Sequence, residues 1–107
     1  MNNDFFCLDS VDEAVIRTER AKARELRKTR WWQQKTAPGT CYYCGKKVGY
    51  KNLTMDHIIP LSRGGHSTKK NLVPSCKDCN NRKKTLLPVE WEEYMRTLGK
   101  DKGGTVK

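Results

Sequence analysis

The sequence predicts one small α+β domain that is stapled by a single zinc ion and carries added helices at both ends. The chain has 107 residues, a length typical of one domain with a modest core that a bound metal would reinforce. Four of its five cysteines fall in two C-x-x-C pairs. Two short β-prone runs lie between these pairs, and helix-forming runs lie outside them. The chain therefore divides into residues 1–36, 37–87 and 88–107.

The first region, residues 1–36, is predicted to be a basic helical extension. Ser10 and Glu13 have the spacing of a capping box, and no Pro or Gly interrupts residues 12–34. Residues 17–35 contain eight basic and two acidic residues. A helix with this excess is either a solvated surface helix or an arm that binds nucleic acid. Its candidate phosphate contacts are Arg24 and Arg27.

The central region is predicted to hold two strands and a short helix. The runs at residues 53–59 and 71–76 are rich in β-prone residues. Residues 77–87 are predicted to form the helix, which Pro88 ends. In the last region a helix begins at Pro88 and stops at Gly99, and a frayed tail follows.

The two C-x-x-C pairs are the strongest metal signal in the sequence. They are separated by 31 residues, and each supplies two thiolates from one turn. Together they complete a tetrahedral four-thiolate site, which suits Zn²⁺ and stabilises a fold rather than performing catalysis. The alternatives are a redox dithiol, which would need a thioredoxin-like βαβ context, or an iron–sulfur cluster. The predicted zinc ligands are Cys41, Cys44, Cys76 and Cys79, and Cys7 is expected to remain a free thiol.

An acid stands beside a histidine in the stretch MDHIIPLSRGG, residues 55–65. Adjacent side chains on a strand point to opposite faces. Asp56 and His57 are therefore either one core and one surface residue, or the edge of a site. The two C-x-x-C pairs, here called the knuckles, close a loop that contains this pair and Asn71. Asn80 directly follows the second knuckle, on the first turn of the predicted helix.

These motifs resemble the HNH endonuclease family in its zinc-stapled form. The ordered pattern joins a first C-x-x-C knuckle to MDHIIPLSRGG and KKNLVPSCKDCNNRKK, and it covers residues 41–83. The resemblance implies a ββα-metal (His-Me finger) core. It also implies a metal-dependent DNA endonuclease that leaves 5′-phosphate and 3′-hydroxyl ends. Asn80 stands where the family name has its final His, so the chain resembles an HNN-type variant.

The same resemblance implies roles for four residues. His57 would be the general base, because a neutral imidazole accepts a proton near neutral pH. Asp56 and Asn80 would bind a catalytic divalent ion, and their oxygen ligands favour Mg²⁺ or Mn²⁺. Asn71 would hold the connecting loop by hydrogen bonds and help to orient the base. A twist or bulge at the strand end must then bring Asp56 and His57 to one site.

The charge of the chain indicates a polyanionic partner. The formal net charge is +10 and the pI is about 9.6, which favours nucleic acid over an acidic membrane surface, and the resemblance implies that this nucleic acid is DNA. Basic residues beside the predicted site would neutralise phosphates and make binding depend on salt. The candidate contacts there are Arg63, Lys83 and Lys84.

Two other classes of protein share part of this pattern. A non-catalytic zinc module that binds DNA or RNA would have the same charge and cysteines, but it has no use for the ordered Asp56, His57 and Asn80. A protein-interaction zinc ribbon does not call for so large a positive charge. No apolar run approaches the roughly 18 residues of a membrane span, and the N-terminus lacks the features of a secretory signal. We expect a cytoplasmic protein of bacterial or phage origin, and the sequence leaves open whether it forms a homodimer.

Overall fold

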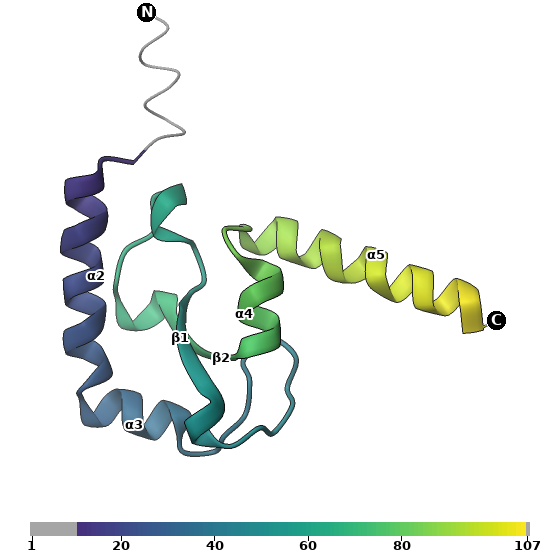
Figure 1. The fold of residues 1–107 in the computed structure, drawn as a ribbon, viewed down its shortest axis with the longest axis horizontal. Coiled ribbons are helices and arrows are strands. Elements are labelled where there is room, and N and C mark those ends of the chain that lie inside the picture. Colours follow the sequence, from purple (N-terminus) through teal and green to yellow (C-terminus); the bar gives the residue numbers. More distant parts are fainter. Residues whose placement is uncertain (1–10, 107) are drawn as a thin grey trace, which may run out of the picture.

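The structure, a computed structural model, describes residues 11–106, and their side chains as far as residue 98. The fold is α+β, as predicted, with helices arranged around one two-stranded antiparallel sheet (Figure 1). The strands are β1 (Leu53–His57) and β2 (Leu72–Cys76). The helices of the described part are α2 (Glu13–Arg27), α3 (Arg30–Thr36), α4 (Lys77–Lys83) and α5 (Pro88–Val106).

The sheet and α4 form the centre of the molecule. The two strands pair without interruption, with Leu53 opposite Cys76 and His57 opposite Leu72. Every residue of β2 is buried, whereas four of the five residues of β1 are half-buried. The helix α4 begins directly after β2 and contacts both strands. This ββα arrangement places the end of β1 beside α4.

The N-terminal segment differs from the single helix that the sequence predicted. Two helices, α2 and α3, are separated by a break at Thr29, whose backbone is extended and whose hydroxyl accepts a hydrogen bond from the Trp32 amide. A threonine in this role satisfies a free amide at a helix start, so a helix can restart without Pro or Gly. The cap of α2 is Asp12, whose carboxylate accepts a hydrogen bond from the Ala14 amide at 3.0 Å. Ser10, the predicted cap, and Cys7 lie outside the described residues.

The C-terminal helices also differ in length from the prediction. The helix α4 ends at Lys83, before Pro88, because Lys84 adopts a positive φ of 46°. The helix α5 continues past Gly99 to Val106. The predicted stop at Gly99 and the frayed tail after it are therefore wrong. A single glycine costs a helix only about 1 kcal/mol relative to alanine, so it does not by itself end one.

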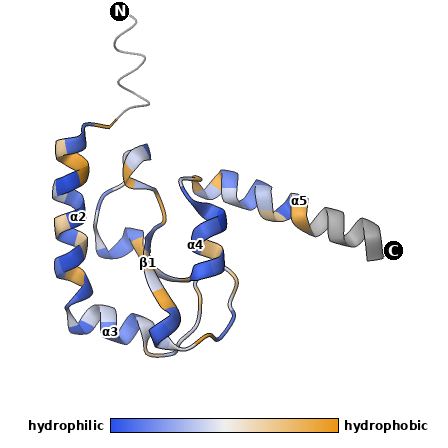
Figure 2. Cartoon of the chain, viewed as in Figure 1, coloured by the Kyte–Doolittle hydropathy of each residue, from blue (hydrophilic) through white to orange (hydrophobic). Residues whose placement is uncertain are grey.

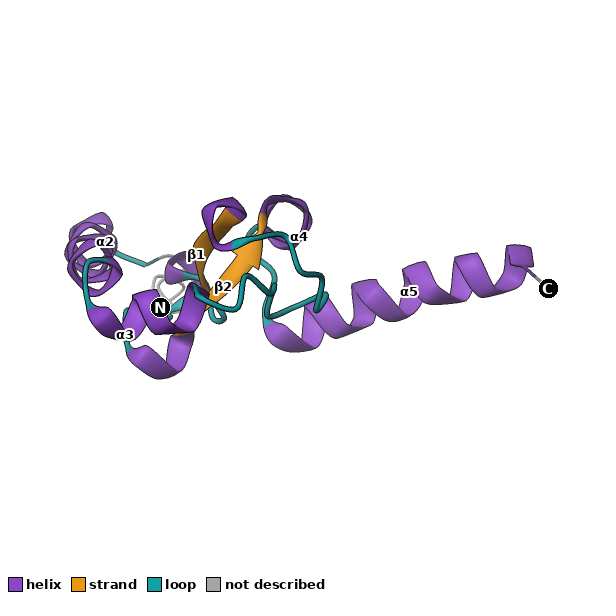
Figure 3. Cartoon of the chain, turned by 90° about the horizontal axis from the view of Figure 1, so that it is seen from below, coloured by secondary structure: helices purple, strands orange, loops and turns teal. Residues whose placement is uncertain are grey.

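The buried core is small and lies on both sides of the sheet. One cluster gathers three of the knuckle cysteines around Trp91 of α5. On the other side, Trp32 of α3 and Ala23 of α2 are buried. Most residues of α2 are hydrophilic (Figure 2), and α5 projects away from the body of the molecule (Figure 3). Among the described residues, no helix is both long enough and apolar enough to cross a membrane.

Candidate metal centre and active site

The four knuckle cysteines meet at one point of the structure. Their sulfur atoms all lie within 4.8 Å of one another, and the sulfurs of Cys44 and Cys76 are 3.9 Å apart. A tetrahedron of Zn–S bonds of ~2.3 Å requires sulfur separations of about 3.8 Å. Both the donor atoms and their spacing therefore fit a zinc ion. The group that could hold it is Cys41, Cys44, Cys76 and Cys79.

Backbone amides stabilise the thiolate of Cys41, the form of a cysteine that binds a metal cation. The amides of Tyr43 and Cys44 donate hydrogen bonds to the Cys41 sulfur at 3.3 and 3.5 Å. Burial disfavours the Cys41 thiolate, yet amide hydrogen bonds outweigh it and lower the pKa of the thiol to about 7. The turn itself requires Gly45, whose φ is +75°.

Asp56 and His57 point to opposite faces of β1, as expected for neighbours on a strand. Asp56 faces α4, where it contacts Lys83, and His57 faces the loop that carries Ser67. The strand pairing shows no bulge between them. Both residues nevertheless border one cleft at the end of β1, together with Arg20 of α2 and Lys84. Of the twist or bulge predicted at the strand end, the bulge is therefore absent, and the pair borders one cleft without it.

Asp56 is held in place by two neighbours. Its Oδ2 accepts a hydrogen bond from the Tyr43 hydroxyl at 2.5 Å and lies 3.3 Å from the Lys83 ammonium. Burial, together with the hydrogen bond to Asp56, raises the pKa of Tyr43, so this hydroxyl remains a donor. Among the described residues, the other carboxylate oxygen, Oδ1, accepts no hydrogen bond. It remains available as a metal ligand.

The structure contradicts the predicted DNA contact of Lys83. Its side chain is completely buried, and its ammonium donates to the His57 carbonyl at 3.1 Å as well as pairing with Asp56. A buried ammonium with two internal partners is not positioned to meet a phosphate in solvent. Sequence reasoning placed Lys83 on the surface because an isolated lysine is nearly always exposed.

Asn80 lies on the same side of β1 as Asp56. Its amide nitrogen donates to the Thr54 hydroxyl at 2.9 Å. Thr54 and Asp56 are two positions apart on β1, so they share one face of the strand. Using the nitrogen for Thr54 leaves the Asn80 amide oxygen for a cation. The two predicted oxygen ligands are thus brought to one face.

His57 is half-buried and its ring environment favours the neutral form. Burial lowers the pKa of His57, and the negative charges of Asp56 and Glu19 oppose that effect without reversing it. The ring nitrogen Nε2 lies 2.9 Å from the Ser67 hydroxyl oxygen. A neutral, anchored imidazole at the edge of a cleft can accept a proton.

Asn71 fastens the loop between the strands. Its side chain accepts a hydrogen bond from the Ile59 amide at 2.8 Å and donates to the carbonyls of Ile59 and His66 at 3.0 and 2.8 Å. Gly65 is enclosed by the same contacts, because a Cβ atom there would lie 1.8 Å from the Ile59 carbonyl oxygen. Gly65 is therefore a close-packed position, not merely a flexible tip.

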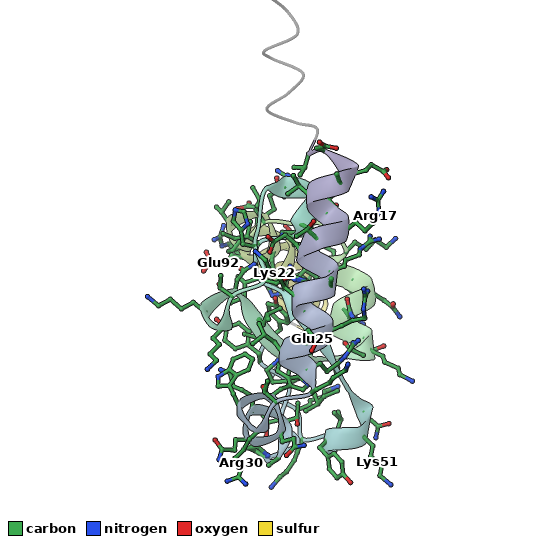
Figure 4. All side chains as sticks on the ribbon, turned by 90° about the vertical axis from the view of Figure 1, so that its left-hand side faces the viewer. Arg17, Lys22, Glu25, Arg30, Lys51 and Glu92 are labelled. Carbon is green, nitrogen blue, oxygen red and sulfur yellow. The ribbon has the colours of Figure 1, made fainter. Side chains whose placement is uncertain are left out.

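Basic residues of α2 line a groove that reaches His57. Arg20, Arg24 and Arg27 border it, with Met55 and His57 on the β1 side. Figure 4 views α2 from its exposed side, where basic side chains project on both sides of the helix. The predicted contacts Arg24 and Arg27 thus lie beside the histidine.

The two remaining predicted DNA contacts, Lys84 and Arg63, have different surroundings. Lys84 is exposed and borders the cleft. Arg63 instead makes two hydrogen bonds to the Glu90 carboxylate, at 3.1 and 3.2 Å, and one to the Thr85 carbonyl. In the structure its guanidinium joins the loop to α5.

Sequence reasoning missed three residues that contact the site. Tyr43, within the first C-x-x-C pair, donates a hydrogen bond to Asp56. Ser67 hydrogen-bonds to His57, and Glu19 in turn accepts hydrogen bonds from Ser67. Only Tyr43 carried a local signal, because it lies within the first C-x-x-C pair.

A hairpin with a helix packed on it, joined to a four-cysteine centre, defines a ββα domain with a metal knuckle. The sequence profile of the HNH endonuclease family matches residues 41–86. The part of the chain that matches this family, residues 41–86, includes the four knuckle cysteines, both strands and α4.

Three proteins of known name are similar to this chain. The CRISPR-associated endonuclease Cas9 of Actinomyces naeslundii is 35% identical over 54 residues, which are 50% of this chain and 5% of that protein. The Cas9 of Corynebacterium diphtheriae is 43% identical over 44 residues, 40% of this chain and 4% of that protein. The type IV methyl-directed restriction enzyme EcoKMcrA of Escherichia coli K12 is 36% identical over 55 residues, 46% of this chain and 20% of that protein. The chain thus corresponds to a fifth or less of each relative.

Proposed function

We propose that this protein is a divalent-metal-dependent DNA endonuclease in which His57 is the general base. One observation carries the proposal: Asp56 and His57, neighbours on β1, border a single cleft, and Asn80 of α4 lies over the face that carries Asp56. The HNH endonuclease domain and the names of the three relatives support a nuclease.

Each active-site residue has one task in this proposal. His57 takes a proton from the attacking water, because burial keeps its ring neutral. Asp56 and Asn80 hold a divalent ion by oxygen atoms, a donor set that favours Mg²⁺ or Mn²⁺. When bound, such an ion supplies charge stabilisation for the scissile phosphate and the leaving oxygen. Asn71 keeps the loop beside the base in place.

The path of the DNA follows from the positions of the arginines. Arg20, Arg24 and Arg27 line a groove that reaches His57, and Lys84 lines the cleft that shares Arg20 and His57 with this groove. Guanidinium groups bind phosphates by paired hydrogen bonds. We propose that a strand of DNA passes along α2 to the cleft, with its phosphates on these side chains.

The deciding experiment incubates the purified protein with supercoiled plasmid in Mg²⁺ or Mn²⁺. Wild-type protein should convert it to nicked or linear DNA, and the chelator EDTA should stop the reaction. His57→Ala should lower the rate by roughly 10²–10⁴-fold, the usual contribution of a general base. Its circular dichroism spectrum should match that of the wild type, since His57 lies at the rim of the core.

The outcomes separate the alternatives. Linear product that appears without a nicked intermediate would indicate two active sites acting together, as in a homodimer. Protein that is inert with each divalent ion but still retards DNA in a gel would contradict the endonuclease and support a zinc-stabilised module that binds nucleic acid. If His57→Ala cleaves DNA as fast as the wild type does, His57 is not the general base.

A further inference from the structure

The helix α2 lies outside the residues that match the HNH family, yet it reaches the proposed base. The cleft places Arg20 beside His57, and the residue before it in the chain, Glu19, points inward. We propose that Glu19 and Ser67 are positioning residues that fix the His57 ring with its proton on Nε2, which leaves Nδ1 as the atom that accepts the proton of water. This inference rests on the proposed function.

Glu19 is unusual among the acids of α2 because it is buried. It is 4% exposed, whereas the Glu25 side chain on the same helix is 75% exposed. Its carboxylate accepts a hydrogen bond from the Ser67 backbone amide at 2.6 Å and lies 3.1 Å from the Lys22 ammonium. The hydrogen bond from the Ser67 amide lowers the pKa of Glu19 to about 2, so the group is charged at neutral pH.

Ser67 is held by Glu19 at two points. Besides the amide contact, the Ser67 hydroxyl lies 2.5 Å from the backbone carbonyl oxygen of Glu19. A carbonyl oxygen can only accept, and a hydroxyl has a single hydrogen to donate. The Ser67 hydrogen is therefore directed at α2.

The tautomer of His57 follows from this assignment. The His57 Nε2 atom lies 2.9 Å from the Ser67 oxygen, which has no hydrogen left to donate and must accept. A hydrogen bond there requires a proton on Nε2. In a neutral imidazole only one nitrogen carries a proton, so Nδ1 has the free lone pair. The hydrogen bond from Nε2 to Ser67 thus determines that Nδ1 is the nitrogen that can act as a base.

Replacing Ser67 separates this role from general stability. Ser67→Ala removes the acceptor of the His57 proton but keeps the backbone amide that holds Glu19. We expect kcat to fall roughly 10–100-fold, as for other residues that orient a functional histidine, while the Kd for DNA stays unchanged. Ser67→Thr retains the hydroxyl and should recover most of the lost rate.

Glu19 is tested by charge removal with a matched control on the same helix. Glu19→Gln weakens the grip on residue 67, so it should lower kcat in the same direction as Ser67→Ala. Glu25→Gln makes the same change of charge at an exposed position of α2 and should leave kcat unchanged. Equal kcat for wild type, Ser67→Ala and Glu19→Gln would overturn the proposal.

A spectroscopic measurement reads the tautomer without relying on cleavage. The chain has two histidines, so comparison with His57→Gln assigns the His57 ring in ¹H–¹⁵N correlation spectra. At about pH 8, above the ordinary pKa of histidine, the wild type should show a protonated Nε2 and an unprotonated Nδ1. Ser67→Ala should shift this balance. A wild-type ring with its proton on Nδ1 would overturn the proposal.

The two measurements also distinguish a failure of this inference from a failure of the proposed function. Protein that does not cleave DNA, but whose His57 carries its proton on Nε2 only while Ser67 is present, would contradict the endonuclease and retain the positioning contact. If Ser67→Ala cleaves DNA as well as the wild type does, the positioning role of Ser67 is contradicted and the endonuclease is retained.

Discussion

The two sides of the sheet are held together in different ways. On the side of the knuckles, a cluster of cysteines packs against Trp91 and could close around one metal ion. On the side of α2, polar contacts join helix, loop and strand through Glu19, Ser67 and His57. The first arrangement depends on a cation and on burial, and the second depends on hydrogen bonds. The cysteine cluster and the hydrogen-bonded contacts can therefore be perturbed independently of one another within one small domain.

Removal of one knuckle sulfur should have the largest effect on stability, and it acts on the knuckle side of the sheet. Cys79→Ser should prevent the core from folding, because binding of a structural zinc contributes about 10–16 kcal/mol in small zinc modules. Circular dichroism and thermal melting measure this directly. Cys7→Ser, which belongs to neither C-x-x-C pair, is the control and should melt like the wild type. A Cys79→Ser variant that melts like the wild type would exclude a structural metal.

Crowding the loop should have the next largest effect, and it acts on the opposite side from the knuckles. Gly65→Ala places a Cβ within 1.8 Å of the Ile59 carbonyl oxygen, so the loop must shift. We expect a loss of about 1–3 kcal/mol in the free energy of unfolding, the usual cost of overpacking. Urea denaturation measures it. Gly45→Ala is the comparison without crowding. No atom lies within 4 Å of its Cβ position, so only the positive φ opposes that substitution.

Acid should weaken the α2 side through Glu19. Its folded pKa of about 2 lies below the ordinary value of 4.5, so the group stabilises the fold above the ordinary value and loses that contribution as the pH falls toward the folded value. Glu19→Gln should cost about 1.5–3 kcal/mol near neutral pH, the range for hydrogen bonds to a charged group.

The measurement is the difference in melting temperature between Glu19→Gln and wild type as a function of pH. This difference should shrink as the pH is lowered through the same window. The exposed Glu25→Gln variant should show a small difference at every pH. A constant difference for Glu19→Gln would mean that its charge contributes nothing to stability.

The smallest expected effect concerns DNA affinity alone. The double variant Arg24→Ala and Arg27→Ala should bind DNA more weakly without unfolding, since both side chains border an open groove. The slope of log K against log salt should become shallower by about one for each lost phosphate contact. Lys46→Ala with Lys51→Ala removes the same charge from exposed positions away from that groove. An equal change of slope in this control would contradict a specific path along α2.

Local patterns predicted the framework of the domain well. The C-x-x-C spacing identified the four sulfurs that the structure brings together, and β-prone runs located both strands to within a few residues. The ends of helices were less predictable. Thr29 restarts a helix and Gly99 does not stop one, because caps and packing decide between states of similar local energy.

The contacts around the site could not be read from the sequence. Glu19 and Ser67 meet across 48 positions, and no local pattern links a helix acid to a loop hydroxyl. Lys83 is buried because Asp56 and Tyr43 receive its ammonium, the tyrosine ring lying 5.6 Å from it. Each of these pairings exists only after the chain has folded. Charge and spacing alone therefore assigned Lys83 to the surface and gave no role to Glu19 or Ser67.

The buried pair of Lys83 and Asp56 has a consequence for how the site is supplied with metal. The Lys83 ammonium lies 3.3 Å from the Asp56 carboxylate and acts as its counterion, so the charge of this acid is balanced within the chain. A divalent ion that enters alone would create an excess of positive charge in the cleft, which an arriving phosphate would neutralise. Under the proposed function, the ion and a DNA phosphate are therefore expected to bind together, and the Lys83–Asp56 pair is expected to keep its geometry when neither is bound.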